Sequence, residues 1–324
     1  MHIAVFPSLI APVSADTCYG GAEMAALALA ESLAARGHRV ALVGLPGSGG
    51  RGLEVIAAPH TPAFHPGDIV SADPGPFPEI FARLREFDLV HTHFNDPGGL
   101  LALDAARIPA IATLHLSAVF PSTAAVVRST RNIAYVAPSA YAARSYERPC
   151  RVIPNGVSGI ELGRGARSGL AWAGRRTPEK GLDAAIEIAR RAQLPLFVAG
   201  PGDAVSGPGI VDRGRLLRAD VGQLLGRVVA TLVTSSIAEA HPLVAIESLF
   251  AGTPVVGFDV GGLAEIISPS TGVLVPPGDI AAAVSALKKT FAPADCRARA
   301  EASFRHDTMV EAYEGLYRSA VLSG

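Results

Sequence analysis

The sequence predicts an α/β protein built from two doubly wound, Rossmann-like domains. Short apolar runs alternate with longer amphipathic runs of helical period along the whole chain. The apolar runs are nearly continuous, which is typical of parallel strands that helices cover on both faces. A chain of 324 residues is long enough for two such domains. One stretch rich in Gly and Arg, 156–169, has no periodicity and is interpreted as the linker between them.

The alternation runs through the first half of the chain and restarts in the second half. In the first half, the expected strands are 2–9, 39–46, 87–94, 109–116 and 133–139, and the expected helices are 20–38, 98–108 and 139–147. In the second half, the expected strands are 169–175, 195–200, 230–236, 253–259 and 272–277, and the expected helices are 182–193, 221–228, 242–252, 263–267 and 280–291. Strands and helices in this order favour one parallel sheet in each half.

The domain boundaries follow from the aperiodic stretch. Residues 1–158 are expected to form the first domain and residues 159–304 the second, and the terminal helix 305–324 is expected to pack back on the first domain. Ligands of doubly wound sheets bind beyond the carboxyl ends of the strands. The residues that directly follow strands are therefore the candidates for chemistry.

Charge and hydropathy exclude two classes of protein. The chain has 28 basic and 29 acidic residues, a net charge of −1, whereas a general nucleic-acid binder normally has a basic excess. The mean hydropathy is +0.33, but no segment approaches the ~18 uninterrupted apolar residues of a transmembrane helix. Peripheral contact with a membrane and the oligomeric state stay open.

The cysteines and the first residues indicate a compartment. Cys18, Cys150 and Cys296 are odd in number and far apart, which is typical of reduced thiols rather than of a disulfide framework. The apolar start has no basic residue before it and contains Pro7, so it does not fit a signal peptide. These observations predict a cytoplasmic protein.

Two glutamates bracket the start of a helix in the second half. Glu239 follows a strand, Pro242 suits the first turn of the next helix, and Glu247 lies inside that helix. The backbone N–H groups of Leu243 and Val244 would point out of the helix N-terminus, a ready site for phosphate. From the residues alone, a helix-capping Glu239 and a solvated Glu247 are the simpler interpretation.

Two cations lie on one loop of the same half. Arg175 follows a strand and Lys180 precedes a helix, and two fixed cations can hold a diphosphate without a metal ion. Lys180 is one of only three lysines. The alternative is a solvated turn, in which Arg176 is equally a surface residue.

The first half offers weaker signals. Gly20 and Gly21, at a strand-to-helix connection, would let backbone approach a ligand, although an ordinary loop explains them as well. His91 and His93 point to one face of a strand, as a metal pair would, but no third ligand lies at a recognisable spacing, which favours a satisfied strand-end pair. His115 also ends a strand, and by itself it is ambiguous. The dinucleotide fingerprint is absent, which disfavours an NAD enzyme.

Together these stretches resemble the family 4 glycosyltransferases, which have the GT-B fold of two Rossmann-like domains facing across a cleft. The matching motifs occur in family order along nearly the whole chain: YGGAE, THF, LHL, RVIPNGV, AGRRTPEKG, the E-x7-E run from Glu239 to Glu247, GTPVVGFDVGGLAEII and GVLVPPGD. The E-x7-E run with the segment after it is the most specific of them.

The resemblance implies a glycosyltransferase that moves a sugar from a nucleotide-diphosphate donor to an acceptor such as a small molecule, a natural product or a glycan precursor. It further implies retention of configuration, no metal and no cofactor, with a UDP-sugar favoured over a GDP-sugar as donor. The first domain then holds the acceptor, and the second binds the nucleotide sugar.

The resemblance also assigns roles to individual residues. Those matching Glu239 and Glu247 contact the donor sugar and the nucleotide ribose, and those matching Arg175 and Lys180 hold the diphosphate. Gly20 and Gly21 close over the phosphate, and His115 lies near the donor sugar and acceptor as a catalytic residue.

Two departures from the family pattern bear on the donor. His241 and Pro242 stand beside the sugar where smaller residues are common, and the segment 202–211, near which base contacts usually begin, is short. A sugar-nucleotide 2-epimerase or hydrolase of the same fold is the alternative function. A non-catalytic, two-lobed binding protein of the periplasmic type is a more distant alternative.

Overall fold

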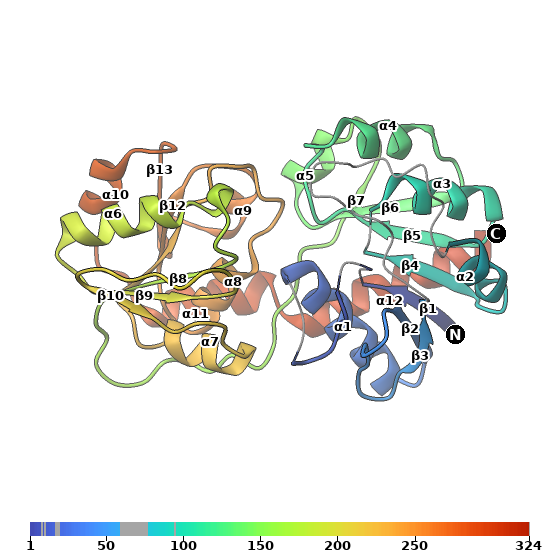
Figure 1. Cartoon of the computed structure of the whole chain (residues 1–324), viewed down its shortest axis with the longest axis horizontal. Helices are drawn as coiled ribbons and strands as arrows, with labels where there is room; N and C mark the ends of the chain where they lie inside the picture. The colour runs from blue at the N-terminus through green and yellow to red at the C-terminus, as the bar shows by residue number, and fades with distance from the viewer. Residues whose placement is uncertain (8, 10, 17–19, 59–76, 94, 324) are drawn as a thin grey trace. The chain divides into compact units, whose positions relative to one another are not determined.

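The computed structural model divides the chain into two compact units (Figure 1). It describes residues 1–7, 9, 11–16, 20–58, 77–93 and 95–323. The first unit comprises Met1–Pro154 with Asp307–Gly324, and the second comprises Asn155–His306. The chain therefore passes between the units twice, after Pro154 and after His306.

The first unit contains a seven-stranded sheet in the order β3-β2-β1-β4-β5-β6-β7, in which all neighbours are parallel. Its strands are β1 (His2–Phe6), β2 (Arg39–Gly44), β3 (Glu54–Ala57), β4 (Leu89–Thr92), β5 (Ala110–Thr113), β6 (Ile133–Ala137) and β7 (Arg151–Val152). Its helices are α1 (Gly21–Ala35), α2 (Phe77–Leu84), α3 (Pro97–Ala106), α4 (Pro121–Ser129), α5 (Ala140–Ser145) and the terminal α12 (His306–Ser323).

Each face of this sheet has its own apolar core. Side chains of α1 and α12, among them Leu29, Leu33, Tyr313 and Tyr317, pack on one face. Side chains of α2, α3 and α4 pack on the other. The strands between them are apolar on both faces for this reason, and α12 completes the core of the first unit although it ends the chain.

The second unit contains a six-stranded parallel sheet in the order β10-β9-β8-β11-β12-β13. Its strands are β8 (Leu170–Ala173), β9 (Leu196–Ala199), β10 (Ile210–Asp212), β11 (Ala230–Val233), β12 (Val255–Phe258) and β13 (Gly272–Val275). Its helices are η1 (Pro178–Lys180), α6 (Leu182–Ala192), α7 (Arg218–Leu225), α8 (Leu243–Phe250), α9 (Leu263–Ile266), α10 (Ile280–Ala286) and α11 (Pro293–Ser303).

The prediction of two doubly wound parallel sheets is confirmed, and the strand orders show where each can bind a ligand. The order reverses between β1 and β4 in the first unit and between β8 and β11 in the second. Ligands of such sheets bind outside the carboxyl ends of the strands at this switch point. Three strands, β3, β7 and β10, were not predicted from the sequence, because they are short edge strands without a buried apolar run.

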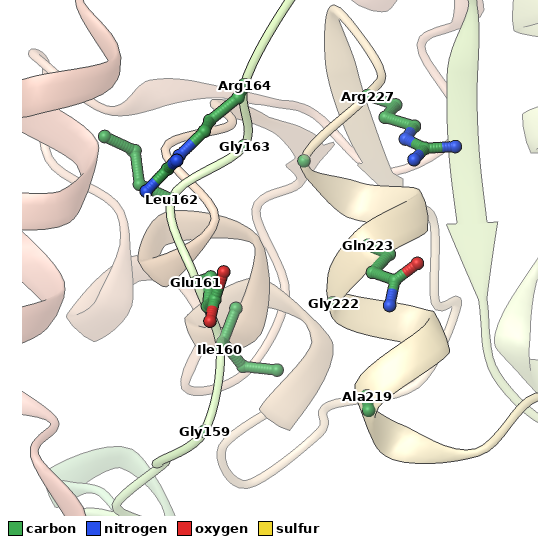
Figure 2. A pocket seen from close by; sticks show the side chains of 11 residues that line it. Gly159, Ile160, Glu161, Leu162, Gly163, Arg164, Ala219, Gly222, Gln223 and Arg227 are labelled. Atoms are coloured by element: carbon green, nitrogen blue, oxygen red, sulfur yellow. The ribbon is translucent and has the colours of Figure 1, made fainter.

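The stretch 156–169, interpreted from the sequence as the linker between the domains, lies within the second unit. Val157 and Ile160 are buried in the core of the second unit, and Gly163 N–H donates to the carbonyl of Ala251 at 3.0 Å. Figure 2 shows Gly159–Arg164 running beside α7, with which it lines a surface pocket. The sequence does not reveal this packing, because the few buried apolar side chains stand among glycines and because Arg167 is held through its guanidinium, which donates to the carbonyls of Gly252 and Ala251.

Among the helices of the described part of the chain, none is both long enough and apolar enough to cross a membrane.

Candidate functional site

In the second unit, the loops after β8 and β11 are joined by hydrogen bonds. Thr234 Oγ1 donates to the carbonyl of Gly181 at 2.7 Å, and Ser236 N–H donates to that of Glu179 at 2.9 Å. Gly181 has a φ of +71°, and a Cβ at this position would lie 1.9 Å from the Thr234 carbonyl oxygen. A glycine is therefore required, and it brings the two loops together at the switch point.

This junction pairs Lys180 with Glu239. Lys180 Nζ lies 2.5 Å from Glu239 Oε2, and Ser235 Oγ donates to the other carboxylate oxygen. The two charged side chains are 20% and 19% exposed, so both can be reached from solvent. The structure thus brings together two residues that the sequence analysis assigned to one ligand, and it adds Ser235, which that analysis missed.

The glycine pair after β12 supports Glu239 through its backbone. Gly262 N–H donates to the Glu239 carbonyl at 2.8 Å. Gly261 has a φ of +69°, and a Cβ there would lie 2.3 Å from the same oxygen. The G-G that follows the E-x7-E run therefore holds the glutamate loop in place.

Arg175 lies on the same loop as Lys180 and is more exposed. Arg175 Nη2 is 4.0 Å from Glu179 Oε1, and its side chain is 37% exposed. Thr177 Oγ1 donates to Glu179 Oε1 at 2.6 Å, and this hydrogen bond is the main reason that the pKa of Glu179 lies below its usual value. The loop thus carries two cations, each beside a carboxylate.

The neighbouring Arg176 is not the surface residue that the alternative interpretation allowed. Its side chain is 4% exposed and forms a two-pronged ion pair with Asp212, with Nη1 at 2.7 Å from Oδ2. Nη1 also donates to the carbonyl of Asp203 at 2.6 Å. Hydrogen bonding to Arg176 holds the pKa of Asp212 well below its usual range. Arg176 therefore fixes the β9–β10 loop.

Helix α8 presents its N-terminus beside Glu239. Pro242 directly precedes the helix, and no side chain caps it. Among the described residues, no hydrogen bond is recorded to the N–H groups of Leu243 and Val244, which are half-buried. N–H groups in this position at a helix N-terminus are suited to an anion.

Glu247 lies one turn further along α8 and has a partner that the sequence analysis missed. Its side chain is 12% exposed, and Oε1 lies 3.4 Å from Nε of Arg218, the first residue of α7. Burial raises the pKa of Glu247, and the Arg218 charge opposes that rise. No spacing rule links the two positions, since α7 and α8 meet only in the folded unit.

His241 faces the interior of the second unit. It is buried, and its ring packs edge-on against Phe304, with the centroids 5.5 Å apart. Asn155 Nδ2 donates to the His241 carbonyl at 3.3 Å. The sequence placed His241 beside the donor sugar, and in the structure its ring contacts Phe304 of the same unit.

In the first unit, Gly20 and Gly21 lie at the start of α1. Gly20 is the residue before the helix and has an extended φ of −153°. A Cβ on Gly20 would lie 3.0 Å from Glu23 Oε2, so the backbone here is close to a carboxylate. Cys18 and Tyr19 lie outside the described residues.

The histidines of the first unit form a buried cluster. His91 Nδ1 is 2.6 Å from Tyr317 Oη and Nε2 is 2.8 Å from Thr113 Oγ1, so both ring nitrogens are satisfied. His93 Nδ1 lies 2.7 Å from His115 Nε2. No group of three or more potential metal ligands occurs in the part of the chain that the structure describes. Phe94 lies outside that part.

Burial keeps these rings neutral. It lowers the pKa of His91 to about 3 and that of His115 to about 4, and it lowers the pKa of His93 well below the ordinary value. A neutral imidazole donates one hydrogen bond and accepts another. The cluster is therefore a chain of donors and acceptors at the carboxyl ends of β4 and β5.

Each half of the chain matches a model of a protein family. Residues 19–158 match the model described as Glycosyltransferase Family 4, and residues 167–292 match the model described as Glycosyl transferases group 1. The chain spans only 16% and 42% of the lengths of the first curated relatives that it matches.

Similarity to other proteins extends over the full chain. A phosphatidyl-myo-inositol mannosyltransferase of Mycobacterium leprae is 28% identical over 98% of this chain and 97% of its own length. The structure of AviGT4, a glycosyltransferase involved in avilamycin A biosynthesis, is 24% identical with a TM-score of 0.74, covering 100% of this chain and 99% of that one. Anabaena HepE in complex with UDP is 19% identical with a TM-score of 0.73, covering 98% and 100%. These neighbours have the same two-domain fold.

Proposed function

Because the chain belongs to the glycosyltransferases of family 4, we propose that it transfers a hexosyl group from a nucleotide-diphosphate donor to an acceptor, with retention of configuration. The observation that carries the proposal is the meeting of Lys180, Glu239 and the α8 N-terminus at the switch point of the second unit. Cations and free N–H groups at such a point match the diphosphate of a nucleotide sugar.

The diphosphate replaces a protein carboxylate as the partner of Lys180. In the structure, Lys180 is paired with Glu239 at 2.5 Å. An incoming diphosphate brings more negative charge than one carboxylate, so it draws Lys180 and Arg175 to itself and leaves Glu239 to accept hydrogen bonds from the donor sugar. The two cations and the helix N-terminus then stabilise charge on the leaving diphosphate without a metal ion.

Glu247 is proposed to accept hydrogen bonds from the nucleotide ribose. For this it must be ionised, although burial raises its pKa. Arg218, 3.4 Å away, favours the ionised form. The pair thus supplies a charged acceptor in a site that would otherwise protonate it.

In the chemical step, the bond from the anomeric carbon to the diphosphate oxygen breaks, and a bond to the acceptor oxygen forms. The acceptor proton goes to the departing phosphate, which is the base. His115 is proposed to hydrogen-bond the donor sugar as a neutral imidazole, since its lowered pKa prevents it from carrying a charge at neutral pH.

UDP is proposed as the nucleotide, and the UDP complex of Anabaena HepE supports it as the first donor base to test. The name of the Mycobacterium leprae relative supports an inositol-containing lipid or a related glycan precursor among the first acceptors to test. Cys150 and Cys296 are free thiols, which supports action in a reducing compartment such as the cytoplasm.

The test has two parts. Melting temperatures are measured with UDP-, GDP-, ADP- and dTDP-sugars, and a UDP-sugar is expected to raise the melting temperature most, because it binds only the folded state. Nucleotide release is then followed with and without acceptors, and with EDTA. Acceptor-dependent release that survives EDTA supports the transferase. Release or epimerisation that needs no acceptor identifies a hydrolase or 2-epimerase instead, and binding without turnover identifies a binding protein.

A further inference from the structure

His93 is a buried residue with no role in the function proposed so far. Its side chain lies between two other histidines: its ring centroid is 4.2 Å from that of His91 and 5.0 Å from that of His115. The residue is 5% exposed, so it cannot contact a large substrate itself. Its contact with the substrate, if it has one, must pass through a neighbour.

One hydrogen bond links His93 to His115. Nδ1 of His93 lies 2.7 Å from Nε2 of His115, and both rings are neutral, so one ring donates and the other accepts. The direction of this bond decides which nitrogen of His115 carries its proton.

The second ring nitrogen of His93, Nε2, indicates which of the two rings donates this hydrogen bond. Nε2 of His93 is buried and has no hydrogen-bond partner among the residues that the structure describes. A buried N–H group without a partner is rarer and more costly than a buried lone pair without one. The proton of His93 is therefore on Nδ1, and Nδ1–H donates to Nε2 of His115.

His91 cannot supply the missing partner, because both of its nitrogens are already engaged. Its Nδ1 lies 2.6 Å from Tyr317 Oη and its Nε2 lies 2.8 Å from Thr113 Oγ1, which also lies 2.9 Å from Tyr313 Oη. These contacts tie the His91 ring to α12 and leave it as a fixed surface against which His93 packs. The His93 ring is thereby held in one orientation.

We infer that His93 is a positioning residue that holds His115 in the tautomer with its proton on Nδ1. Nδ1 of His115 makes no hydrogen bond to the described residues, and the side chain is half-buried. The N–H group presented to a ligand is therefore Nδ1–H, a donor suited to a sugar hydroxyl. The inference rests on the proposed role of His115 in transfer, but the tautomer itself does not depend on that role.

The first experiment reads the tautomer directly. The full chain is labelled with ¹⁵N-histidine, the ring signals of His115 are identified by their loss in His115→Gln, and spectra are taken at pH 7.5. The wild type is expected to show a proton on Nδ1 of His115. In His93→Leu the donor is lost, and the His115 signals are expected to move toward the Nε2–H tautomer that free imidazole side chains prefer.

Two further variants separate positioning from packing. His93→Asn places an amide N–H near the former Nδ1, so it is expected to restore the Nδ1–H tautomer. Tyr313→Phe removes a buried hydroxyl from the same cluster without touching His115, and it is expected to leave the tautomer unchanged. An Nε2–H tautomer in the wild type, or an unchanged tautomer in a folded His93→Leu, overturns the inference.

Turnover of UDP-glucose distinguishes the two proposals. His93→Leu is expected to lower kcat roughly ten-fold at unchanged donor KM, and His93→Asn is expected to recover most of the lost kcat. The double variant His93→Leu/His115→Gln is expected to have nearly the same kcat as His115→Gln alone, because the two residues act as one unit. Loss of turnover in His115→Gln but not in His93→Leu overturns the positioning role alone. Full turnover in His115→Gln overturns the proposed role of His115, and the tautomer result still decides what His93 does.

Discussion

The two units place opposite kinds of chemistry at equivalent edges of their sheets. In the second unit, charged side chains form a pair that solvent can reach, Lys180 with Glu239. In the first unit, His91, His93 and His115 form a buried cluster whose pKa values all lie well below 6.5. The first set lies where solvent can reach it, whereas desolvation keeps the second set neutral.

The difference matches what each site is proposed to do. Charged groups that water can reach are free to exchange partners, so a diphosphate can displace Glu239 from Lys180. Neutral groups that are buried keep their partners, so a single tautomer and ring orientation can be maintained. The donor side therefore depends on exchangeable charge, and the side of His115 depends on fixed hydrogen bonds.

The largest expected effect on activity comes from removing a charged side chain of the second unit. Lys180→Ala removes a cation from the diphosphate site and leaves Glu239 without its partner. The fall in kcat/KM is expected to correspond to a loss of about 2–4 kcal/mol of transition-state stabilisation. Lys288→Ala, at an exposed lysine of the same unit, is the control and should change nothing. Steady-state kinetics with equal loss in both variants would contradict the assignment.

On the neutral side, His115→Ala is expected to lower kcat on the order of 10²-fold, as for the loss of one preorganised donor. UDP binding and melting temperature should stay near those of the wild type, because the cations that hold the diphosphate lie in the second unit. Calorimetry and kinetics on the same preparation check both. A lowered melting temperature with normal turnover per folded molecule would make His115 a structural residue.

Acid should destabilise the first unit before the second. As the pH falls below 6.5, an unfolded histidine takes up a proton, whereas His91 stays neutral until about pH 3 in the folded protein. The unfolded state thus gains protons first, so folding stability is lost as pH falls, by about 1.4 kcal/mol per pH unit for such a histidine. The pKa of Asp212 is shifted downward, so its stabilising effect is lost only below about pH 4.

Urea unfolding at pH 7.5 and 5.5 measures this difference. Fluorescence of Trp172, the single tryptophan, reports on the second unit, and amide exchange of β4 and β5 peptides reports on the first. His91→Gln keeps an amide in place of the ring and should reduce the pH dependence in the first unit. Equal acid sensitivity in both units would contradict the proposed contrast.

The smallest expected effect concerns the ribose contact. Glu247→Gln is expected to raise the donor KM roughly ten-fold with little change in kcat, because the contact is made in the ground and transition states alike. Arg218→Ala removes the charge that opposes protonation of Glu247, so its pKa rises further and the increase in donor KM on acidification begins at higher pH. Arg218→Lys retains a positive charge and serves as the matched variant. If the donor KM depends on pH in the same way in the wild type, Arg218→Ala and Arg218→Lys, Arg218 does not have this role.

Most residues of the proposed donor site were also singled out in the sequence, because they lie on loops that directly follow strands. Lys180 and Glu239 are 59 residues apart, but each comes soon after a strand beside the switch point, so the parallel order of β8 and β11 brings them together. Arg218 was missed because it comes from the start of α7, after an edge strand that the apolar pattern does not mark. The Gly- and Arg-rich stretch was misinterpreted because its buried apolar side chains, Val157 and Ile160, are too few to form a periodic pattern.

The sequence by itself determined the fold class, since alternating apolar and amphipathic periods follow from the need to cover parallel sheets on both faces. It also determined which loops carry charge. Only the tertiary structure decided the state of the histidines, because that state depends on desolvation and on partners distant in the chain. His91 is neutral and oriented because α12 brings Tyr317 to it from 226 residues away. No local sequence pattern predicts the hydrogen bond between His91 and Tyr317, because it forms only when the last helix of the chain packs on the first sheet.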